Sequence, residues 1–258
     1  MPTGSDLFTV SMPIASLYRE PSYASALDTQ LLHGTDFEVD EINEGWAKGC
    51  SVSPIKNSTV PGYEGYVPIS ELTMKTGDAT HIITALCAPV FKTANIKSGV
   101  TAMWPMTVLC IGKPAGEFIE TCEGFVHGRH IRALSESPPE PDFVSIAERY
   151  IGRPYIWAGV SAVGLDCSGL VQTSLRATGR DVPRDSGDQS KIGDEIEAGA
   201  PLMRGDLIFW SGHVGIMQDA ERLLHANAYH MAVESEPLSV AVDRIAKNYG
   251  PITSRRRL

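Results

Sequence analysis

A proline-rich segment at residues 135–141 separates two parts of the chain that follow different folding patterns. It reads SESPPEP, with three prolines in seven residues, and such a run can continue neither a helix nor a central strand. Before it, short runs alternate between apolar and polar residues, which is typical of strands. After it, apolar residues first recur at helical spacing. The chain is therefore predicted to be an α+β protein with a domain boundary at residues 135/136.

Alternating runs predict an all-β structure for the first part. Four such runs are residues 37–42, 63–68, 81–86 and 106–110. The tetrapeptide EGYV at residues 64–67 recurs as EGFV at residues 123–126, which indicates two copies of one small barrel. A polar stretch before residue 80 favours a linker between them. The predicted domains are residues 1–76, 77–135 and 136–258.

Composition excludes several classes of function. The chain has 258 residues and a net charge of −9, with 22 basic and 31 acidic residues. An acidic balance argues against nucleic-acid binding, because that binding depends on neutralising phosphates. No apolar run reaches the roughly 18 residues that a membrane span needs. The N-terminus carries neither a basic patch nor an apolar core typical of a signal peptide. We therefore expect no nucleic acid or membrane partner and a cytoplasmic location.

The cysteines point to free thiols. The chain has five, at positions 50, 87, 110, 122 and 167, an odd number without the spacing of metal ligands. In a reducing cytosol they are expected to stay unpaired. We expect no metal and no cofactor.

The last 120 or so residues are predicted to begin with helices and end with an antiparallel sheet. Apolar residues at positions 143, 146, 147, 150 and 151 follow one face of a helix. A second helix is predicted to open at Cys167 and to end before Gly179, a residue type favoured just after a helix. Four strands are expected at residues 206–210, 213–218, 222–228 and 231–234.

Cys167, His213 and His225 offer the groups of a cysteine nucleophile. A helix N-terminus favours the thiolate, so Cys167 at the start of the second helix is a candidate nucleophile. His213 opens a strand and could accept the thiol proton and return it to the leaving group. His225, on the predicted next strand, could orient His213. Asn227 and His230 are alternatives for that orienting role.

Tyr155, in the segment PYIW at residues 154–157, is a candidate oxyanion donor beside the backbone N–H of Cys167. Core packing is an equally good interpretation of the tyrosine. The polar segment at residues 183–189 lines a substrate cleft or is a surface loop, and spacing does not decide between the two.

Five segments together resemble the NlpC-type cell-wall peptidases. They are PYIW at 154–157, LDCSGLVQ at 165–172, PRDS at 183–186, RGDLIFW at 204–210 and GHVGI at 212–216. The resemblance covers about residues 142 to 258. It implies a papain-like α+β domain with a Cys–His–polar triad, which falls on Cys167, His213 and His225.

The first part of the chain resembles the paired bacterial SH3-like domains of one branch, the γ-D-glutamyl-L-diamino-acid endopeptidases. That branch cuts the bond between γ-D-Glu and a diamino acid in peptides with a free N-terminal L-Ala. Its first SH3-like domain closes one end of the catalytic cleft. The resemblance implies substrate-binding roles for Tyr63, Asp166, Ser168 and Ser186. Asp28 and Glu20 are candidates for the acidic contact to the substrate amine.

Two departures from the family pattern bear on the site. Residues 157–159 read Trp-Ala-Gly where the family has Trp-Gly-Gly. The extra methyl group of Ala158 is tolerable unless the backbone there needs a positive φ. The loop at residues 51–61 is longer than usual and leads into Tyr63, so it bears on the shape of that end of the cleft.

The resemblance implies a cytoplasmic cysteine endopeptidase that recycles murein peptides carrying a free N-terminal L-Ala. Which diamino acid follows D-Glu, meso-diaminopimelate or lysine, stays open. Two alternatives also stay open. One is an amidase or acyltransferase with the same Cys–His chemistry, although permuted lipid-acting relatives place His before Cys. The other is a protein that binds wall peptides without cleaving them.

Overall fold

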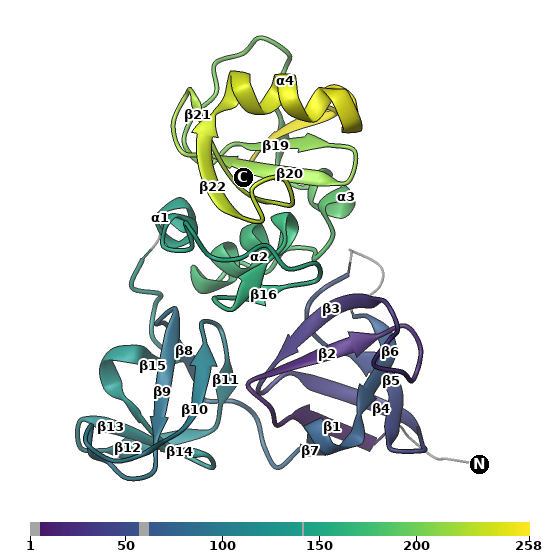
Figure 1. Ribbon diagram of the computed structural model, residues 1–258. Helices are drawn as coiled ribbons and strands as arrows, with labels where there is room; N and C mark the ends of the chain where they lie inside the picture. The colour runs from purple at the N-terminus through teal and green to yellow at the C-terminus, as the bar shows by residue number, and fades with distance from the viewer. Residues whose placement is uncertain (1–5, 57–61, 141) are drawn as a thin grey trace. The chain divides into compact units, whose positions relative to one another are not determined.

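The computed structural model describes residues 6–56, 62–140 and 142–258. Its chain forms two compact units: unit 1 runs up to Ser137, apart from a short segment after Ile55, and unit 2 continues from Pro138 (Figure 1). Residues 57–61 of the predicted 51–61 loop and Pro141 of the predicted boundary lie outside the described residues. The division of the first part into domains at residues 76/77 stays a prediction.

A seven-stranded sheet forms the first half of unit 1, in the order β3-β2-β6-β5-β4-β1-β7. Its strands are β1 (Asp6–Val10), β2 (Ile14–Tyr18), β3 (Leu27–Leu32), β4 (Asp36–Asn43), β5 (Trp46–Ser51), β6 (Glu64–Pro68) and β7 (Leu72–Met74), with the 3-10 turn η1 (Ile69–Glu71) before β7. The predicted strand at residues 37–42 is confirmed in β4, where Phe37 and Val39 are buried and Glu38 is exposed. Glu44 and Gly45 both have positive φ, which suits the tight hairpin between β4 and β5.

The second half of unit 1 holds two smaller sheets, ordered β10-β9-β14-β13-β12 and β11-β8-β15. Their strands are β8 (His81–Ile83), β9 (Cys87–Phe91), β10 (Val100–Pro105), β11 (Leu109–Cys110), β12 (Gly112–Ala115), β13 (Phe118–Thr121), β14 (Gly124–His127) and β15 (Ile131–Ala133), with η2 (Gly128–His130) before β15. The strand predicted at residues 106–110 is shorter than expected, because Thr107 has a φ of 69° and turns the chain.

The repeated EGYV and EGFV tetrapeptides occupy matching places in the two halves. Gly65 of β6 lies against the end of β2, where a Cβ would come 2.7 Å from the carbonyl oxygen of Tyr18. Gly124 of β14 lies against the end of β9, where a Cβ would come 2.4 Å from the carbonyl oxygen of Phe91. In both halves only glycine lets the two strands approach this closely. This close approach explains why both copies of the repeat have a glycine at this position.

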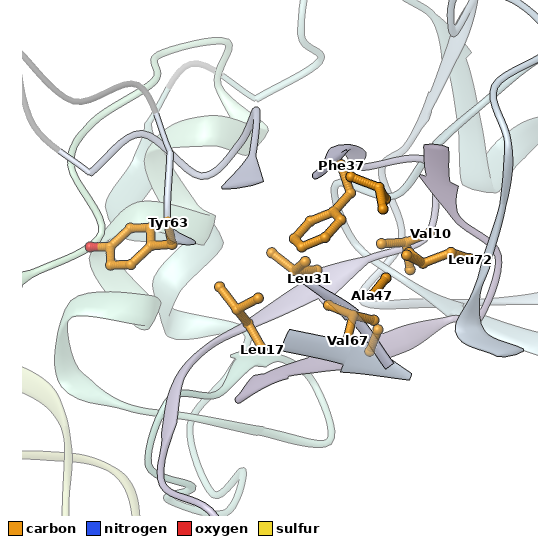
Figure 2. Close-up of a cluster of buried hydrophobic side chains, with 10 residues drawn as sticks. Val10, Leu17, Leu31, Phe37, Ala47, Tyr63, Val67 and Leu72 are labelled. Carbon is orange, nitrogen blue, oxygen red and sulfur yellow. The ribbon is translucent and has the colours of Figure 1, made fainter. Parts of the chain in front are cut away.

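A cluster of buried side chains fills the first half of unit 1 (Figure 2). Its members are Val10, Ala15, Leu17, Leu31, Phe37, Val39, Ala47, Tyr63, Val67 and Leu72. Figure 2 shows that the ring of Tyr63 extends away from the other labelled side chains, with its hydroxyl group outermost. Tyr63 is thus anchored by this core while its phenol is directed out of it.

Unit 2 combines short helices with a six-stranded sheet, ordered β18-β23-β19-β20-β21-β22. Its elements are α1 (Phe143–Glu148), β16 (Val160–Ser161), β17 (Gly164–Leu165), α2 (Cys167–Ala177), α3 (Ser186–Gln189), β18 (Asp194–Glu195), β19 (Leu207–Trp210), β20 (His213–Met217), β21 (Arg222–Asn227), β22 (Ala232–Pro237), α4 (Leu238–Tyr249) and β23 (Ser254–Arg257). The predicted α+β organisation is confirmed.

Helix α2 begins and ends as the sequence predicts. The side chain of Asp166 accepts a hydrogen bond from the N–H of Gly169 and caps the N-terminus. At the other end, Gly179 has a φ of 83°, and the N–H groups of Gly179 and Arg180 donate to the carbonyls of Arg176 and Leu175. This pairing is a Schellman motif, which satisfies the last carbonyl groups of the helix. Cys167 is therefore the first residue of a helix with well-defined ends.

The sheet of unit 2 is buried on both faces at its centre. All four residues of β19 are buried, although successive strand residues point to opposite faces. Ile208 and Trp210 pack with Ala241 and Ile245 of α4, and Figure 1 shows α4 above the central strands. None of the helices in the described part of the chain is long and apolar enough to span a membrane.

Ala158 lies in a turn that requires a positive φ. Its φ is 67° and its side chain is buried. An alanine in this left-handed region brings its Cβ close to the following carbonyl oxygen, a strain of about 1–2 kcal/mol that glycine escapes. The departure at residues 157–159 is therefore a strained position.

We predict that Ala158→Gly stabilises the protein by about 1 kcal/mol, because removing the Cβ relieves that strain. Ala162→Gly is the control, since Ala162 is equally a buried loop alanine but lacks a positive φ. That control should lose about 0.5–1 kcal/mol. Urea unfolding of the three proteins measures both effects, and an Ala158→Gly loss matching the control would contradict the strain.

Candidate active site

Cys167 lies at the first position of α2, and its thiol packs against the start of β20. The thiol is buried, and the backbone N–H groups of Val214 and Ser168 act on its sulfur to lower the pKa. Val214 follows His213 directly in β20. The fold thus brings the predicted nucleophile next to the strand that begins with the predicted base.

The thiol of Cys167 is neutral at rest. Burial, and to a smaller extent the negative charge of Asp166, raises the pKa of Cys167 to about 12. The two backbone N–H groups and the positive charge of Arg184 act in the opposite direction. From sequence, the helix N-terminus was expected to favour the thiolate. In the structure, desolvation outweighs that effect, so the thiol has to lose its proton during the reaction.

Asp166 forms the centre of a buried polar cluster below Cys167. Its two carboxylate oxygens accept hydrogen bonds from the guanidinium of Arg184 at 2.8 and 2.6 Å, a bidentate ion pair. One of them also accepts from the N–H of Gly169 at 2.7 Å and from the hydroxyl of Ser168 at 3.2 Å. Arg184 donates further to the hydroxyl of Ser168 at 2.8 Å.

This cluster uses two of the residues that the resemblance assigns to substrate, Asp166 and Ser168. Asp166 and Ser168 are buried, and their side chains bond each other and Arg184. Their roles in substrate binding stay predictions. In the structure, they fix the first turn of α2 and hold Arg184.

The turn at residues 156–159 packs directly on the start of α2. The N–H of Asp166 donates to the carbonyl of Gly159 at 3.2 Å, and Arg184 reaches the same carbonyl at 3.4 Å. A Cβ on Gly169 would lie 2.2 Å from this carbonyl oxygen, so only glycine fits there. The motif around Cys167 therefore needs its glycine for close packing.

His213 and His225 form a hydrogen-bonded pair. Nε2 of His213 lies 2.8 Å from Nδ1 of His225. The two side chains come from neighbouring strands, β20 and β21. Asn227 and His230, the alternative partners, instead bond each other through Oδ1 of Asn227 and Nδ1 of His230 at 3.0 Å. The structure thus brings His225 to His213, and its orienting role stays a prediction.

The second ring nitrogen of His225 is paired with a carboxylate. Nε2 of His225 lies 2.7 Å from Oε1 of Glu236 on β22, and both oxygens of Glu236 accept hydrogen bonds from Arg244 on α4. Burial would raise the pKa of Glu236, but the hydrogen bonds from Arg244 and His225 lower it to about 2. Burial lowers the pKa of His213 to about 3 and also lowers that of His225. Near neutral pH, both imidazoles are neutral and Glu236 is ionised.

Tyr155 lies within electrostatic range of the thiol. Burial is the largest of the causes that raise the pKa of Tyr155 to about 12, and the nearby Cys167 and Asp166 contribute in the same direction. Its backbone N–H donates to the carbonyl of Met231 at 3.0 Å, which fixes the segment against the loop before β22. The phenol therefore keeps its proton and can donate a hydrogen bond near Cys167, as an oxyanion donor would.

The other predicted substrate contacts are spread over both units. Tyr63, Asp28 and Glu20 lie in unit 1, where Asp28 accepts from Arg19 at 2.6 Å and Glu20 is exposed. Ser186, in unit 2, is the partly buried first residue of α3. Their roles stay predictions.

Sequence reasoning missed three residues of this site: Arg184, Glu236 and Arg244. Helix α4 carries a usable signal, because Leu238, Ala241, Val242 and Ile245 recur at helical spacing. Neither the pairing of Arg184 with Asp166 nor that of Glu236 with His225 has a characteristic spacing, and both depend on the folded strands.

We predict that Arg184→Met destabilises the protein by about 3–5 kcal/mol, because it leaves the buried Asp166 carboxylate without its cation. The double variant Arg184→Met with Asp166→Asn should recover part of this loss, since no uncompensated charge remains buried. Arg176→Met, on α2, is the control, because Arg176 pairs with the exposed Asp181 and its loss leaves no buried charge unpaired. Guanidinium unfolding measures all four proteins, and equal losses in the single and double variants would contradict the ion-pair explanation.

Comparison with known families identifies both parts of the chain. Residues 152–247 match the model of the NlpC/P60 family, and residues 17–53 match the model of the bacterial dipeptidyl-peptidase SH3 domain. The first match contains Cys167, His213, His225 and Glu236. The second covers the whole of β3, β4 and β5.

Curated relatives resemble most of the chain. It is 26% identical to the γ-D-glutamyl-L-lysine dipeptidyl-peptidase of Bacillus cereus over 84% of this chain and 72% of that protein. It is also 26% identical to the enzyme of that name from Bacillus subtilis, over 81% and 75% of the two chains. The dipeptidyl-peptidase 6 of Lysinibacillus sphaericus is 24% identical over 83% and 85%.

A solved structure shares the whole fold. The crystal structure of an NlpC/P60 family protein from Bacillus cereus superimposes with a TM-score of 0.81 at 20% identity, covering 97% of this chain and 99% of the other. Together, these findings show that the chain carries an NlpC/P60 domain preceded by a bacterial dipeptidyl-peptidase SH3 domain.

Proposed function

We propose that the protein is a cysteine endopeptidase that cleaves the bond between γ-D-Glu and a diamino acid in cell-wall peptides with a free N-terminal L-Ala. The observation that carries the proposal is the buried thiol of Cys167 at a helix start, next to the strand that presents the His213–His225 pair. The relatives named γ-D-glutamyl-L-lysine dipeptidyl-peptidase support this choice of bond.

The resting site sets the order of the chemical steps. Because the thiol and both imidazoles are neutral, His213 acts as a general base when the sulfur of Cys167 attacks the γ-glutamyl carbonyl. The protonated His213 then donates its proton to the amine of the departing diamino acid. An acyl-enzyme remains, in which the γ-carboxyl carbon of D-Glu is bound to sulfur. A water, deprotonated by His213, hydrolyses that thioester and restores the thiol.

The developing oxyanion has two candidate donors. The first N–H groups of a helix have no partner within the helix, so the N–H of Cys167 is available at the reacting carbon. Tyr155 supplies a second donor, because its raised pKa keeps the phenol protonated. Two donors fixed before the reaction are what stabilisation of a tetrahedral intermediate requires.

Recognition of the free amine belongs to acidic residues outside the Asp166 cluster. A dipeptidyl-peptidase releases a dipeptide from the N-terminus of its substrate, so it has to tolerate or bind a charged amine. Asp166 is already paired with Arg184. We assign the amine contact to Asp28 or Glu20, because the ion pair of Asp28 with Arg19 is exposed and yields more readily than the buried Asp166–Arg184 pair. A requirement for a free L-Ala amine would restrict the enzyme to peptides already released from the sugar strands, as recycling demands.

We predict cleavage of L-Ala-γ-D-Glu-L-Lys or its meso-diaminopimelate counterpart, with L-Ala-D-Glu as the product. Acetylating the L-Ala amine should lower kcat/KM at least 100-fold, because the charge that the acidic contact recognises is lost. Mass spectrometry of the digests measures both rates.

Two cysteine variants separate the alternatives. Cys167→Ala should abolish turnover, and Cys87→Ala, which alters an exposed thiol in unit 1, should leave it unchanged. Release of the amide-bonded substituent from wall fragments without peptide cleavage would favour an amidase. Tight peptide binding with no product, in wild type and Cys167→Ala alike, would favour a binding protein and contradict the proposal.

A further inference from the structure

A line of hydrogen bonds leads from α4 to the predicted catalytic base. Arg244 on α4 donates to both oxygens of Glu236. Oε1 of Glu236 lies 2.7 Å from Nε2 of His225, and Nδ1 of His225 lies 2.8 Å from Nε2 of His213. The side chains of His225 and Glu236 are almost completely buried. Both ring nitrogens of His225 therefore have one protein partner and little access to water.

Only one arrangement of protons satisfies this line near neutral pH. An ionised carboxylate can only accept hydrogen bonds, so Nε2 of His225 has to carry a proton. The neutral ring of His225 then has a lone pair at Nδ1, so Nε2 of His213 has to donate to it. A neutral His213 protonated at Nε2 has its lone pair at Nδ1. That nitrogen is the one left over for the thiol of Cys167.

We propose that Glu236, held in place by Arg244, is a positioning residue that sets the protons of His225 and His213 and so keeps Nδ1 of His213 unprotonated. The proposal rests on the proposed function, in which Nδ1 of His213 accepts the thiol proton. A neutral histidine pair without such an end group has two proton arrangements of similar energy. In the second one, His213 carries its proton at Nδ1 and cannot act as a base toward Cys167.

Arg244 makes Glu236 a reliable acceptor. Its guanidinium binds the carboxylate with two hydrogen bonds and lies 4.5 Å above the ring of Tyr229. This cation holds the pKa of Glu236 low and also lowers that of His225. His230 acts in the same direction on His225. Burial is the largest cause that lowers the pKa of His225, and together with Arg244 and His230 it outweighs the raising effect of Glu236, so the ring stays neutral beside an ionised carboxylate.

The same cluster is a poor cation site. His225, His230 and Glu236 offer ligand atoms within 4.8 Å of one another. However, Arg244 already occupies both oxygens of Glu236, and a second cation would have to displace it. Ordering of protons is thus the role that the observed contacts favour.

The deciding variant removes the acceptor and keeps the shape. In Glu236→Met, the guanidinium of Arg244 loses its carboxylate partner. It then donates a hydrogen bond to Nε2 of His225, which has to be unprotonated to accept it. His225 then carries its proton at Nδ1 and donates to His213, whose own proton moves to Nδ1. We expect kcat for the tripeptide to fall at least 100-fold with KM within about threefold, comparable to other catalytic histidines held in the wrong tautomer.

A second substitution should restore part of the kcat lost in Glu236→Met. In Glu236→Met with Arg244→Met, no cation competes for Nε2 of His225, so both proton arrangements are populated. We expect kcat to recover at least tenfold over the single variant. Glu236→Asp keeps an acceptor and should retain more activity than Glu236→Met. Glu221→Met, at an exposed position just before β21, is the matched control and should behave as wild type.

Nitrogen-15 NMR of labelled histidines shows which ring nitrogen carries the proton, and the measurement needs no substrate. Wild type should show His213 and His225 protonated at Nε2, and Glu236→Met should show His213 protonated at Nδ1. A kcat within threefold of wild type in Glu236→Met would overturn the proposal, as would a loss of kcat with unchanged tautomers. If Glu236→Met does not fold, the double variant Glu236→Met with Arg244→Met provides the test. Finding only the Nε2-protonated form of His213 in that double variant would overturn the proposal. Absence of peptide cleavage by wild type would contradict the proposed function alone, because the NMR comparison still tests the proton order.

Discussion

The buried ion pair between Asp166 and Arg184 is the interaction on which the geometry around Cys167 depends. Asp166 caps α2, and the same carboxylate binds a guanidinium that also reaches the hydroxyl of Ser168 and the carbonyl of Gly159. Three segments distant in sequence thus meet at one charge pair. A surface ion pair contributes little, but removing one partner of a buried pair leaves a charge without compensation. The position of the nucleophile therefore depends on contacts beneath it.

That same environment decides the state of the thiol. A helix N-terminus stabilises a negative charge by about 0.3–1 kcal/mol. Raising the pKa of Cys167 from 9.0 to about 12 corresponds to about 4 kcal/mol against the thiolate. Burial and the neighbouring Asp166 carboxylate consequently outweigh the helix. The same burial keeps His213 neutral, so the resting site holds a thiol and an imidazole, and charge develops only as the carbonyl is attacked.

The sequence predicts the helices and strands of this site better than the side-chain contacts that join them. Periodicity places the start of α2 at Cys167, and Gly179 marks its end, because both signals act within a few residues. The repeat at residues 64–67 and 123–126 is also local, since each glycine serves one close strand contact. Ala158 shows the limit: the chain has an alanine where the backbone takes a positive φ. Only the glycine that the resembled family has at this position indicates that conformation.

Arg184, Glu236 and Arg244 could not be found in the same way. Each acts through a partner that only the assembled sheet and helices bring near, and a buried arginine resembles a surface arginine in sequence. The C-terminal run of arginines, at residues 255–257, likewise has a partner that only the folded chain brings near. It forms strand β23, and Arg257 binds Asp206 at 2.7 Å, although a basic tail is ordinarily solvated.

The pH dependence of Cys167 alkylation tests the neutral resting state most directly. Iodoacetamide labelling of the native protein, resolved by peptide with exposed Cys87 as an internal reference, gives the rate at each pH from 5 to about 10. With a thiol pKa of about 12, the Cys167 rate should rise about tenfold per pH unit without levelling off in this range. A rate that is high and constant down to pH 5 would mean a preformed thiolate–imidazolium pair and would contradict the account.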